Sequence, residues 1–184
     1  MEKIITESEL ANCRALTVGM MRTIENEECE FRDEWILSHG WAVVPVESGA
    51  RLPREDIPRL VSVLNAWGFQ DCVAIMTETP INPPEVDQDC YRLSVTEGEL
   101  REVNRELGPY RFLLTDRDRS WAISCNEWYN LFGAEPALAE ALLGRSIEST
   151  RKEFEVFGTL LGRDNYYPLV LMARRYESLS ARLD

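Results

Sequence analysis

Three short apolar segments separated by two polar turns, all between Arg111 and Gly133, constrain the fold more than any other part of the chain. The apolar segments are 112–114, 121–123 and 128–132. Their spacing predicts a meander of antiparallel strands, because turn-type residues fill the gaps between them. Strands this short are stable only when one face of their sheet is covered. We therefore expect the helical patterns on either side of this segment to pack against it.

Helical and strand patterns continue through the rest of the 184 residues, and together they predict one domain. We expect an N-terminal helical segment over about 7–38, an α+β core over about 41–133 and C-terminal helices over about 135–184. The first helix should span about 7–26. Between residues 28 and 38 two structures compete: a bent continuation of that helix that stops at Gly40, which we favour, and a hairpin through His39-Gly40.

The core shows the order strand, helix, strand, strand, helix, strand, followed by two more strands. These elements are expected at 41–46, 55–67, 71–77, 90–95, 97–107, 111–115, 120–125 and 128–132. The first six have the order of a split βαβ unit, as in ferredoxin-like folds. The predicted fold class is α+β: a mostly antiparallel sheet of about five or six strands with a ferredoxin-like βαββαβ core, on which the N-terminal helix and the C-terminal helices pack. Leu64 and Ile123 should be nearly fully buried in that core.

The chain is strongly acidic, with 32 Asp and Glu residues against 20 Lys and Arg residues and a formal net charge of -12. Binding to a nucleic acid backbone or to anionic lipid depends on clustered basic residues, so this balance argues against nucleic acid and membrane partners. The N-terminal sequence does not resemble a signal peptide, and no apolar run approaches the ~20 residues of a membrane span. We expect a soluble, cytoplasmic protein.

The five cysteines are widely spaced, odd in number and include no C-x-x-C pair. They are Cys13, Cys29, Cys72, Cys90 and Cys125. This pattern favours reduced thiols over a disulfide framework or a zinc site. His39 is the only histidine, so a catalytic dyad of cysteine and histidine would need it. Because no motif surrounds any of the cysteines, we interpret them as structural.

No P-loop, G-x-G-x-x-G or G-x-S-x-G motif occurs in the chain. We therefore predict no cofactor and no metal site, and the sequence assigns no catalytic residue. The alternating segment Asp116-Arg117-Asp118-Arg119 contains no glycine-rich stretch that could hold phosphates. We interpret it as a hairpin turn whose charges pair with one another.

Acidic residues concentrate between Glu25 and Glu34, and this segment is the candidate surface for a protein partner. The candidate protein-binding residues are Glu27, Glu28, Glu30, Asp33, Glu34 and Trp128. A solvated helix face explains the same acids without a partner. Trp128 lies between Glu127 and Tyr129, and it is the tryptophan that we expect to be exposed.

These observations predict a non-enzymatic, protein-binding module, of the inhibitor or immunity type, whose partner is a basic protein. One alternative is a small enzyme or small-molecule binder with a cleft between the sheet and the C-terminal helices. Another is a structural subunit that associates with itself into a homo-oligomer. Convergent polar groups inside a cleft would favour the enzyme or small-molecule binder, whereas a flat acidic or aromatic patch would favour protein binding.

Overall fold

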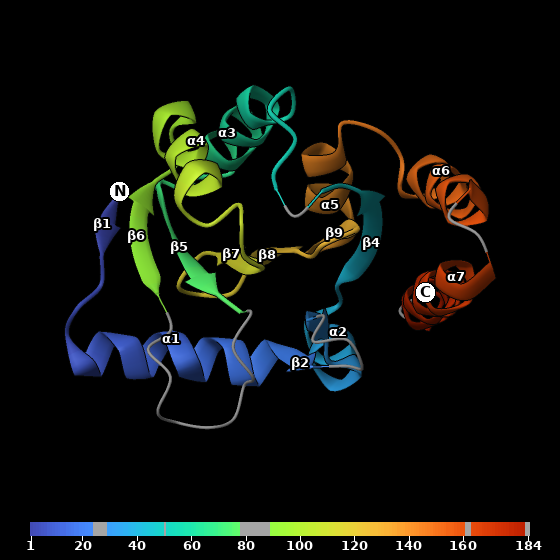
Figure 1. Ribbon diagram of the computed structural model, residues 1–184, viewed down its shortest axis with the longest axis horizontal. Coiled ribbons are helices and arrows are strands. Elements are labelled where there is room, and N and C mark those ends of the chain that lie inside the picture. Colours follow the sequence, from blue (N-terminus) through green and yellow to red (C-terminus); the bar gives the residue numbers. More distant parts are fainter. Residues whose placement is uncertain (24–28, 50, 78–88, 161–162, 183–184) are drawn as a thin grey trace.

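The protein is described by a computed structural model that covers residues 1–23, 29–49, 51–77, 89–160 and 163–182. This part of the chain forms three layers, with a seven-stranded antiparallel sheet between two sets of helices (Figure 1). A separate pair of strands, β2 (Met21–Thr23) and β3 (Cys29–Phe31), lies beside it. The predicted α+β class and the mostly antiparallel sheet are confirmed.

The large sheet takes its strands from residues 2–134, and helices lie both between these strands and after them. The strands of this sheet are β1 (Glu2–Lys3), β4 (Ala42–Glu47), β5 (Asp71–Met76), β6 (Cys90–Ser94), β7 (Phe112–Thr115), β8 (Trp121–Cys125) and β9 (Tyr129–Ala134). The helices are α1 (Glu7–Met20), α2 (Asp33–His39), α3 (Ile57–Ala66), α4 (Glu97–Glu106), α5 (Pro136–Leu143), α6 (Ile147–Leu160) and α7 (Arg163–Ser180).

The predicted meander is confirmed, because β7, β8 and β9 are consecutive neighbours in the sheet. Ile123 lies opposite Leu114 on one side and opposite Phe132 on the other. Ile123 and Leu64 are each only 1% exposed, as predicted. The meander therefore supplies the centre of the core as well as the centre of the sheet.

The strand order β1-β6-β5-β7-β8-β9-β4 shows that the expected ferredoxin-like core was wrong. β6, α4 and β7 do form a split βαβ unit, with β5 between the two strands. In the ferredoxin-like order β4 would lie between β6 and β7, but β5 already pairs with both. Pro45, in the middle of β4, has no N–H to donate to a second neighbour. β4 accordingly lies at the opposite edge, paired only with β9.

Alternate residues of each strand face two different cores. On one face Val44, Leu114 and Ile123 pack with residues of α3, α4 and α5. On the other face Val43, Leu113 and Ala122 pack with residues of α1, α2, α6 and α7. Figure 1 shows α3, α4 and α5 above the sheet and α1 and α2 below it. Both faces of the central strands are therefore covered, as the meander requires.

The C-terminal helices α6 and α7 pack against β4 at the edge of the sheet. The Nη2 atom of Arg151 donates hydrogen bonds to the carbonyl of Val43, at 3.5 Å, and to the hydroxyl of Ser180, at 2.8 Å. Covering this edge removes a row of backbone groups that could otherwise pair with another chain. The expectation that the C-terminal helices pack on the sheet is confirmed.

The N-terminal segment differs from the favoured prediction. The first helix ends at Met20 rather than near residue 26, and Cys29–Phe31 is a strand rather than a continuation of the helix. The helix that ends at Gly40 is confirmed as α2, and Gly40 has the left-handed φ of 64° that suits a helix stop. The hairpin through His39-Gly40 does not form. Residues 24–28 lie outside the described part of the chain.

Candidate functional site

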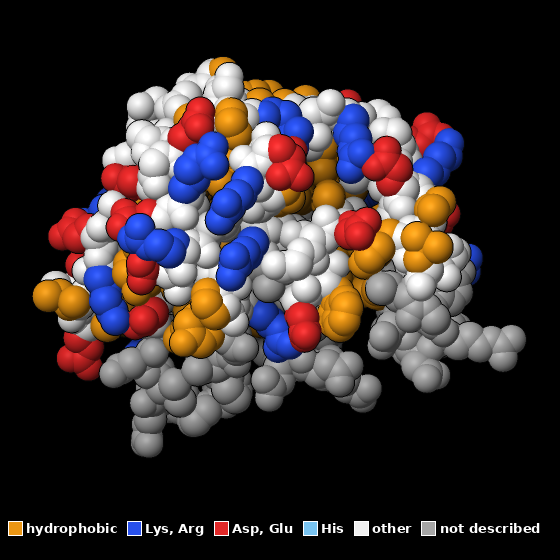
Figure 2. All heavy atoms as spheres, turned by 45° about the horizontal axis from the view of Figure 1, so that its top comes forward, with side chains coloured by type: hydrophobic (Ala, Val, Ile, Leu, Met, Phe, Trp, Pro, Cys, Tyr) orange, Lys and Arg blue, Asp and Glu red, His pale blue; other side chains and the backbone are white. Residues whose placement is uncertain are grey.

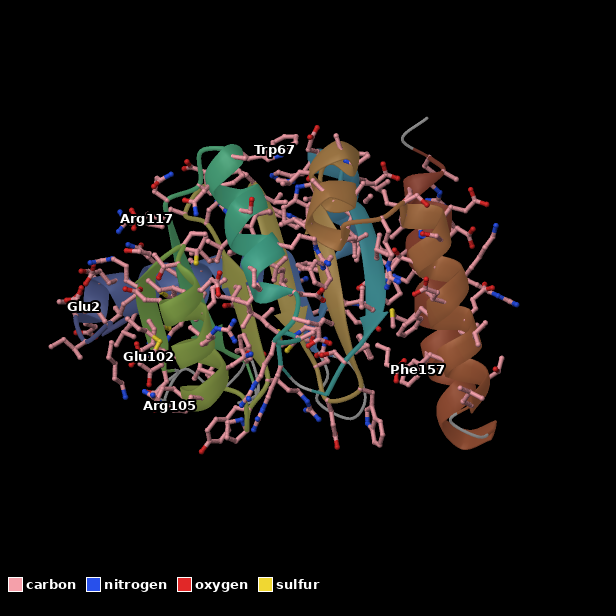
Figure 3. The ribbon with its side chains drawn as sticks, turned by 90° about the horizontal axis from the view of Figure 1, so that it is seen from above. Glu2, Trp67, Glu102, Arg105, Arg117 and Phe157 are labelled. Atoms are coloured by element: carbon pink, nitrogen blue, oxygen red, sulfur yellow. The ribbon has the colours of Figure 1, made fainter. Side chains whose placement is uncertain are left out.

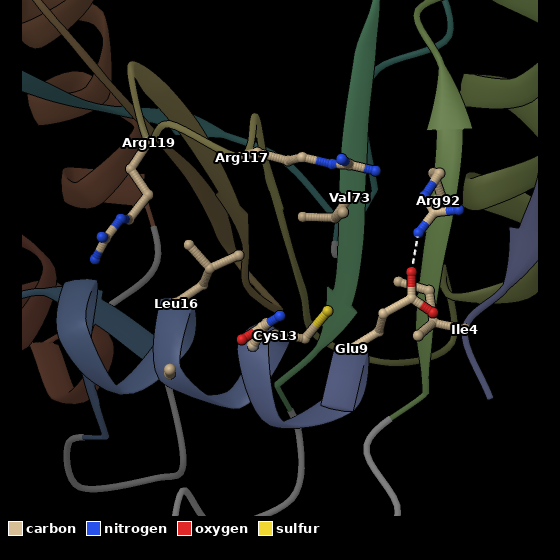
Figure 4. A pocket seen from close by; sticks show the side chains of 10 residues that line it. Ile4, Glu9, Cys13, Leu16, Val73, Arg92, Arg117 and Arg119 are labelled. Atoms are coloured by element: carbon tan, nitrogen blue, oxygen red, sulfur yellow. Dashed lines mark hydrogen bonds and ion pairs between the residues drawn. The ribbon is translucent and has the colours of Figure 1, made fainter. Parts of the chain in front are cut away.

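A cavity of about 480 Å³ lies between α1, the strands β5 and β6, and the loop that joins β7 to β8 (Figure 4). Ile4, Leu16 and Val73 give it apolar walls. Its polar lining residues are Glu9, Asn12, Cys13, Arg92, Arg117 and Arg119. Three arginines against one glutamate leave a surplus of two positive charges among the lining residues, although the whole chain carries -12.

Arg92 reaches the cavity from β6, where it lies opposite Val73 in the sheet register. Its guanidinium forms an ion pair with Glu9 of α1, and a second acid, Glu2, lies 3.8 Å away. The hydroxyl of Thr6 donates a 2.6 Å hydrogen bond to Glu9, and this bond and the one from Arg92 lower the pKa of Glu9. Glu9 therefore stays ionised and holds Arg92 against α1.

The loop between β7 and β8 is held from inside by Asp116. The Asp116 carboxylate is buried and accepts hydrogen bonds from the Ser120 N–H, at 2.7 Å, and the Ser120 hydroxyl, at 2.9 Å. The hydroxyl of Thr115 donates to the carbonyl of Trp121 at 2.7 Å. Because these bonds fix both ends of the loop, the side chains at its tip are presented from a rigid base.

Arg119 has a φ of 59°, the only positive φ of a non-glycine residue among those described. Its guanidinium carbon lies 4.9 Å from the centroid of the Trp35 ring, over the ring face. A Cβ atom at Gly19 would lie only 3.3 Å from Nη1 of Arg119, so α1 allows this close approach by having glycine there. A left-handed non-glycine residue is unusual, and such strain often marks a functional position.

Arg117 differs from the other two arginines. It is exposed and forms no ion pair with any acid in the described part of the chain. Figure 4 shows its side chain extending above Val73 toward Arg92. The positive charge of Arg117 also contributes to the lowered pKa of Glu9. Arg117 is therefore a cation at the cavity that interacts with Glu9 at longer range but forms no ion pair with a described acid.

These residues could bind an anion. Guanidinium groups form paired, charge-assisted hydrogen bonds with carboxylates and phosphates. Ligand pockets of proteins combine apolar walls with a few polar groups, and this cavity has that composition. None of the lining residues is a histidine. The predicted self-pairing of the Asp116–Arg119 turn was wrong, because Asp116 turns inward while Arg117 and Arg119 line the cavity.

The acidic residues predicted as a binding surface are found in two different environments. Glu30 is only 4% exposed and is paired with Arg175 of α7 and, at 3.1 Å, with Arg22. Asp33 accepts a 2.8 Å hydrogen bond from Nε of the same Arg175. Glu34 is exposed. Glu27 and Glu28 lie outside the described residues. Within this set, Glu30 and Asp33 therefore attach α7 to β3 and α2.

Trp128 is 45% exposed, as predicted, and it lies between β8 and β9. It borders a shallow groove together with Glu47, Glu55 and Phe157. Figure 3 shows Phe157 on α6. Trp67 is equally exposed at the end of α3, which the apolar spacing of that helix did not predict. Exposed tryptophans of this kind occur at protein interfaces.

His39 does not form the dyad considered from the sequence. Its ring stacks on Trp35 with 3.6 Å between the centroids. Its Nδ1 atom lies 2.9 Å from the carbonyl oxygen of Trp35 and 2.9 Å from the hydroxyl of Ser38. In the described structure no contact joins His39 to a cysteine, so a nucleophile activated by imidazole is not assembled.

Comparison of the chain with protein family models, curated proteins and solved structures finds no match. Among the residues that the structure describes, no three His, Cys, Asp or Glu side chains gather as metal ligands. Nor does any helix in these ranges have the length and apolar character needed to cross a bilayer. The geometry of the cavity is therefore the basis for a functional proposal.

Proposed function

We propose that this protein binds a small organic anion, with a carboxylate or phosphate group, in the cavity between α1 and the sheet. The observation that carries the proposal is Arg117, which lines the cavity without a described acidic partner. Arg92 approaches Arg117 from β6, whereas Arg119 lines the opposite end of the cavity, where its guanidinium lies over Trp35. A net acidic chain repels anions over most of its surface, so a local surplus of arginine favours a specific site.

The arrangement of the cavity also indicates how the ligand would lie. Arg117 offers hydrogen-bond donors that need not be taken from another residue, whereas Arg92 is shared with Glu9. The anionic group should therefore bind first to Arg117, with Arg92 nearby, because Arg119 lies at the other end of the cavity, over Trp35 and beside Gly19. Ile4, Leu16 and Val73 would contact the apolar part of the molecule. The proposed ligand site lies between α1 and the sheet, whereas the small-molecule alternative considered from the sequence had its cleft between the sheet and the C-terminal helices.

The charge of the ligand is tested by a thermal shift experiment with three compounds of equal chain length: an alkyl phosphate, an alkyl carboxylate and the neutral alcohol. Ligand that binds only the folded state stabilises it by about 2.7 kcal/mol at a concentration 100 times Kd. We expect the two anions to raise the melting midpoint and the alcohol to leave it unchanged. Equal shifts for all three would show that charge is not recognised.

A second function, binding of a basic protein, stays a prediction, and it is favoured by the exposure of Glu34 and Trp128. Acidic and basic side chains are mixed on the side of the molecule that carries α3, α4 and α5 (Figure 2), so that side is not the acidic surface. The test replaces Glu27, Glu28 and Glu34 with Gln and keeps Glu30, because Glu30 is needed by Arg175.

Complementary charge acts mainly on the association rate. With a basic partner captured from lysate, the triple variant should associate several-fold more slowly than the parent at low salt. The difference should shrink as the ~10 Å screening length at 0.1 M becomes shorter. Equal association rates at every salt concentration would exclude this surface.

A further inference from the structure

The two arginines of the loop between β7 and β8 extend to opposite ends of the cavity. Both are lining residues. Figure 4 shows Arg117 reaching toward Arg92 and Arg119 reaching away from it, toward α1. Only Asp118 separates the two arginines in sequence, and the left-handed φ of 59° at Arg119 lets their side chains diverge. One loop therefore supplies a cation at each end of the same cavity.

The strand order places these two ends toward opposite edges of the sheet. Arg92 belongs to β6, which is the neighbour of the edge strand β1. Arg119 lies over Trp35, and the Trp35 ring meets Trp41 edge to face with 5.9 Å between the centroids. Trp41 directly precedes β4, the strand at the opposite edge. The cavity is therefore elongated across the strands.

Apolar side chains separate the two ends. Leu16 of α1 and Val73 of β5 both line the cavity, and in Figure 4 they lie between Arg119 and Arg92. In the sheet register Val73 is opposite Arg92 on one side and opposite Thr115 on the other. It thus stands between the strand that carries Arg92 and the strand that leads into the loop. A molecule that reaches both ends must pass over this apolar surface.

The guanidinium of Arg119 is held in place but keeps its hydrogen-bond donors. It lies over the face of the Trp35 ring, and this cation–π contact requires none of its N–H groups. Among the described residues, no acid forms an ion pair with Arg119. Guanidinium N–H groups that have no protein partner can bind a carboxylate or a phosphate. Arg119 can therefore hold an anionic group of its own.

Each end also contains a buried N–H donor that has no acceptor among the described residues. Beside Arg117 the donor is Nε of Arg92, and beside Arg119 it is Nε1 of Trp35. A buried donor without an acceptor costs free energy, so such donors are uncommon in folded proteins. Hydrogen-bond acceptors are therefore lacking near both ends of the cavity.

We infer that the ligand of this cavity is an elongated dianion, in which an apolar spacer joins two anionic groups. One group binds Arg117 and Arg92. The spacer contacts Leu16 and Val73, and the second group binds Arg119. This inference rests on the proposed function, because it names the class of anion that the same site takes. It makes Arg119 the residue that selects a dianion over a monoanion of the same length.

Titration calorimetry tests the inference with dicarboxylates and monocarboxylates of equal carbon number: adipate with hexanoate, suberate with octanoate, and sebacate with decanoate. The monocarboxylates should bind at the Arg117 end, with an affinity that increases with length as more apolar surface is buried. At the length that spans the cavity, the dicarboxylate should bind at least about tenfold more tightly than its partner, because a second charged group is bound. The advantage should be smaller at other lengths, since the two cations are fixed.

Three single variants assign the effect to a residue. Arg119→Gln should remove the advantage of the dicarboxylate and leave the affinity for the monocarboxylate unchanged, which also shows that the variant is folded. Arg117→Gln should weaken the binding of both. Arg105→Gln removes a paired surface charge on α4 and should change neither affinity. The length dependence in the parent needs no variant, so it decides the matter even if Arg119→Gln does not fold.

The outcomes separate this inference from the proposed function. Equal affinities within every pair, with the monocarboxylates still bound, would overturn the dianion and leave the anion site standing. An advantage that does not vary with length, or that persists in Arg119→Gln, would show that no second fixed cation is used and would overturn it as well. If the parent bound none of the six compounds, the anion site itself would be contradicted.

Discussion

At the scale of single residues, Leu64 shows what the packing of one side chain contributes. It lies on the inner face of α3, is 1% exposed and belongs to the core shared with α4 and α5. Truncation of such a leucine removes buried apolar surface and leaves a cavity. Leu64→Ala should lower the free energy of unfolding by about 2 to 5 kcal/mol in urea denaturation.

Ser62→Ala is the matched control, because Ser62 is exposed on the same helix and its change should stay within about 0.5 kcal/mol. A loss below about 1 kcal/mol for Leu64→Ala would mean that the inner face of α3 is packed differently.

The sequence predicted the burial of apolar side chains well, because they avoid water in every context. It predicted the burial of charged side chains poorly, because they are either exposed to water or buried with a partner of opposite charge. Leu64 and Ile123 are apolar and are buried, and the polar neighbours of Trp128 correctly indicated its exposure. Charged residues are less predictable, because a charge is exposed or buried according to its partner. Glu30 is buried because Arg175 pairs with it, and Arg175 lies far from it in sequence.

At the scale of elements, α7 is attached to β3 and α2 through Arg175. The Arg175 guanidinium pairs with Glu30 and Asp33 and donates a 2.8 Å hydrogen bond to the carbonyl of Phe31. The next residue, Tyr176, accepts a 3.0 Å hydrogen bond from the Phe31 N–H. A short strand thus obtains hydrogen bonds from a helix at the other end of the chain.

Arg175→Gln should therefore destabilise the protein. Removing one partner of a buried pair leaves the other without compensation, at a cost of about 3 to 5 kcal/mol. In the variant, Arg22 still pairs with Glu30. Asp33 is partly exposed to water, which reduces the cost of leaving it unpaired. We therefore expect the free energy of unfolding, measured by chemical denaturation, to fall by about 2 to 3 kcal/mol. Arg174→Gln removes an exposed charge from the same helix and should change stability by less than about 0.5 kcal/mol.

The pairing is tested further by adding Glu30→Gln to Arg175→Gln. The double variant no longer contains the buried Glu30 carboxylate that Arg175→Gln leaves without its partner. Its loss of unfolding free energy should therefore be smaller than the sum of the losses of the two single variants. Strict additivity would show that Glu30 and Arg175 do not interact.

Local patterns predicted the elements better than their order in space. The periodicity of 55–67 and 97–107 predicted α3 and α4, and the turns predicted the meander. The pairing of β4 with β9 depends on contacts distant in sequence, which no local pattern records. The same holds for β3, whose Cys29 N–H bonds to Asn126 Oδ1 at 3.0 Å. The cavity was missed because α1, β6 and the loop after β7 meet only in the folded chain.

At the scale of the whole molecule, both cores contain groups that ionise only at high pH. Burial raises the pKa of Cys72 and Cys125 above the ordinary 9.0 and that of Tyr176 above the ordinary 10.0. Above these ordinary values the unfolded chain loses protons that the folded chain keeps. Stability is therefore fully present below about pH 9 and decreases as the pH rises, by about 1.4 kcal/mol per pH unit for each group.

Urea denaturation between pH 7 and pH 11 measures this decrease. Tyr176→Phe removes one of these groups. Above pH 10 the free energy of unfolding of the variant should therefore fall less steeply than that of the parent, and the two slopes should differ by about 1.4 kcal/mol per pH unit. The variant also loses the hydrogen bond from Phe31 and should be less stable at pH 7. Identical slopes above pH 10 would show that Tyr176 ionises in the folded state.

The proposal that the cavity binds an anion is tested most directly by titration calorimetry of the better of the two anionic ligands into three proteins. They are the parent, Arg117→Gln and Arg105→Gln. Arg105 lies on α4, away from Arg117, and its charge is paired with Glu102 (Figure 3). Both variants lose one positive charge, so a general electrostatic effect would weaken both equally.

Hydrogen bonds to charged groups contribute about 1.5 to 3 kcal/mol, which corresponds to at least about a tenfold change in affinity. We expect Arg105→Gln to bind as the parent does and Arg117→Gln to bind at least about tenfold more weakly. Equal affinities for Arg117→Gln and the parent, or no binding by the parent, would contradict an anion site between α1 and the sheet.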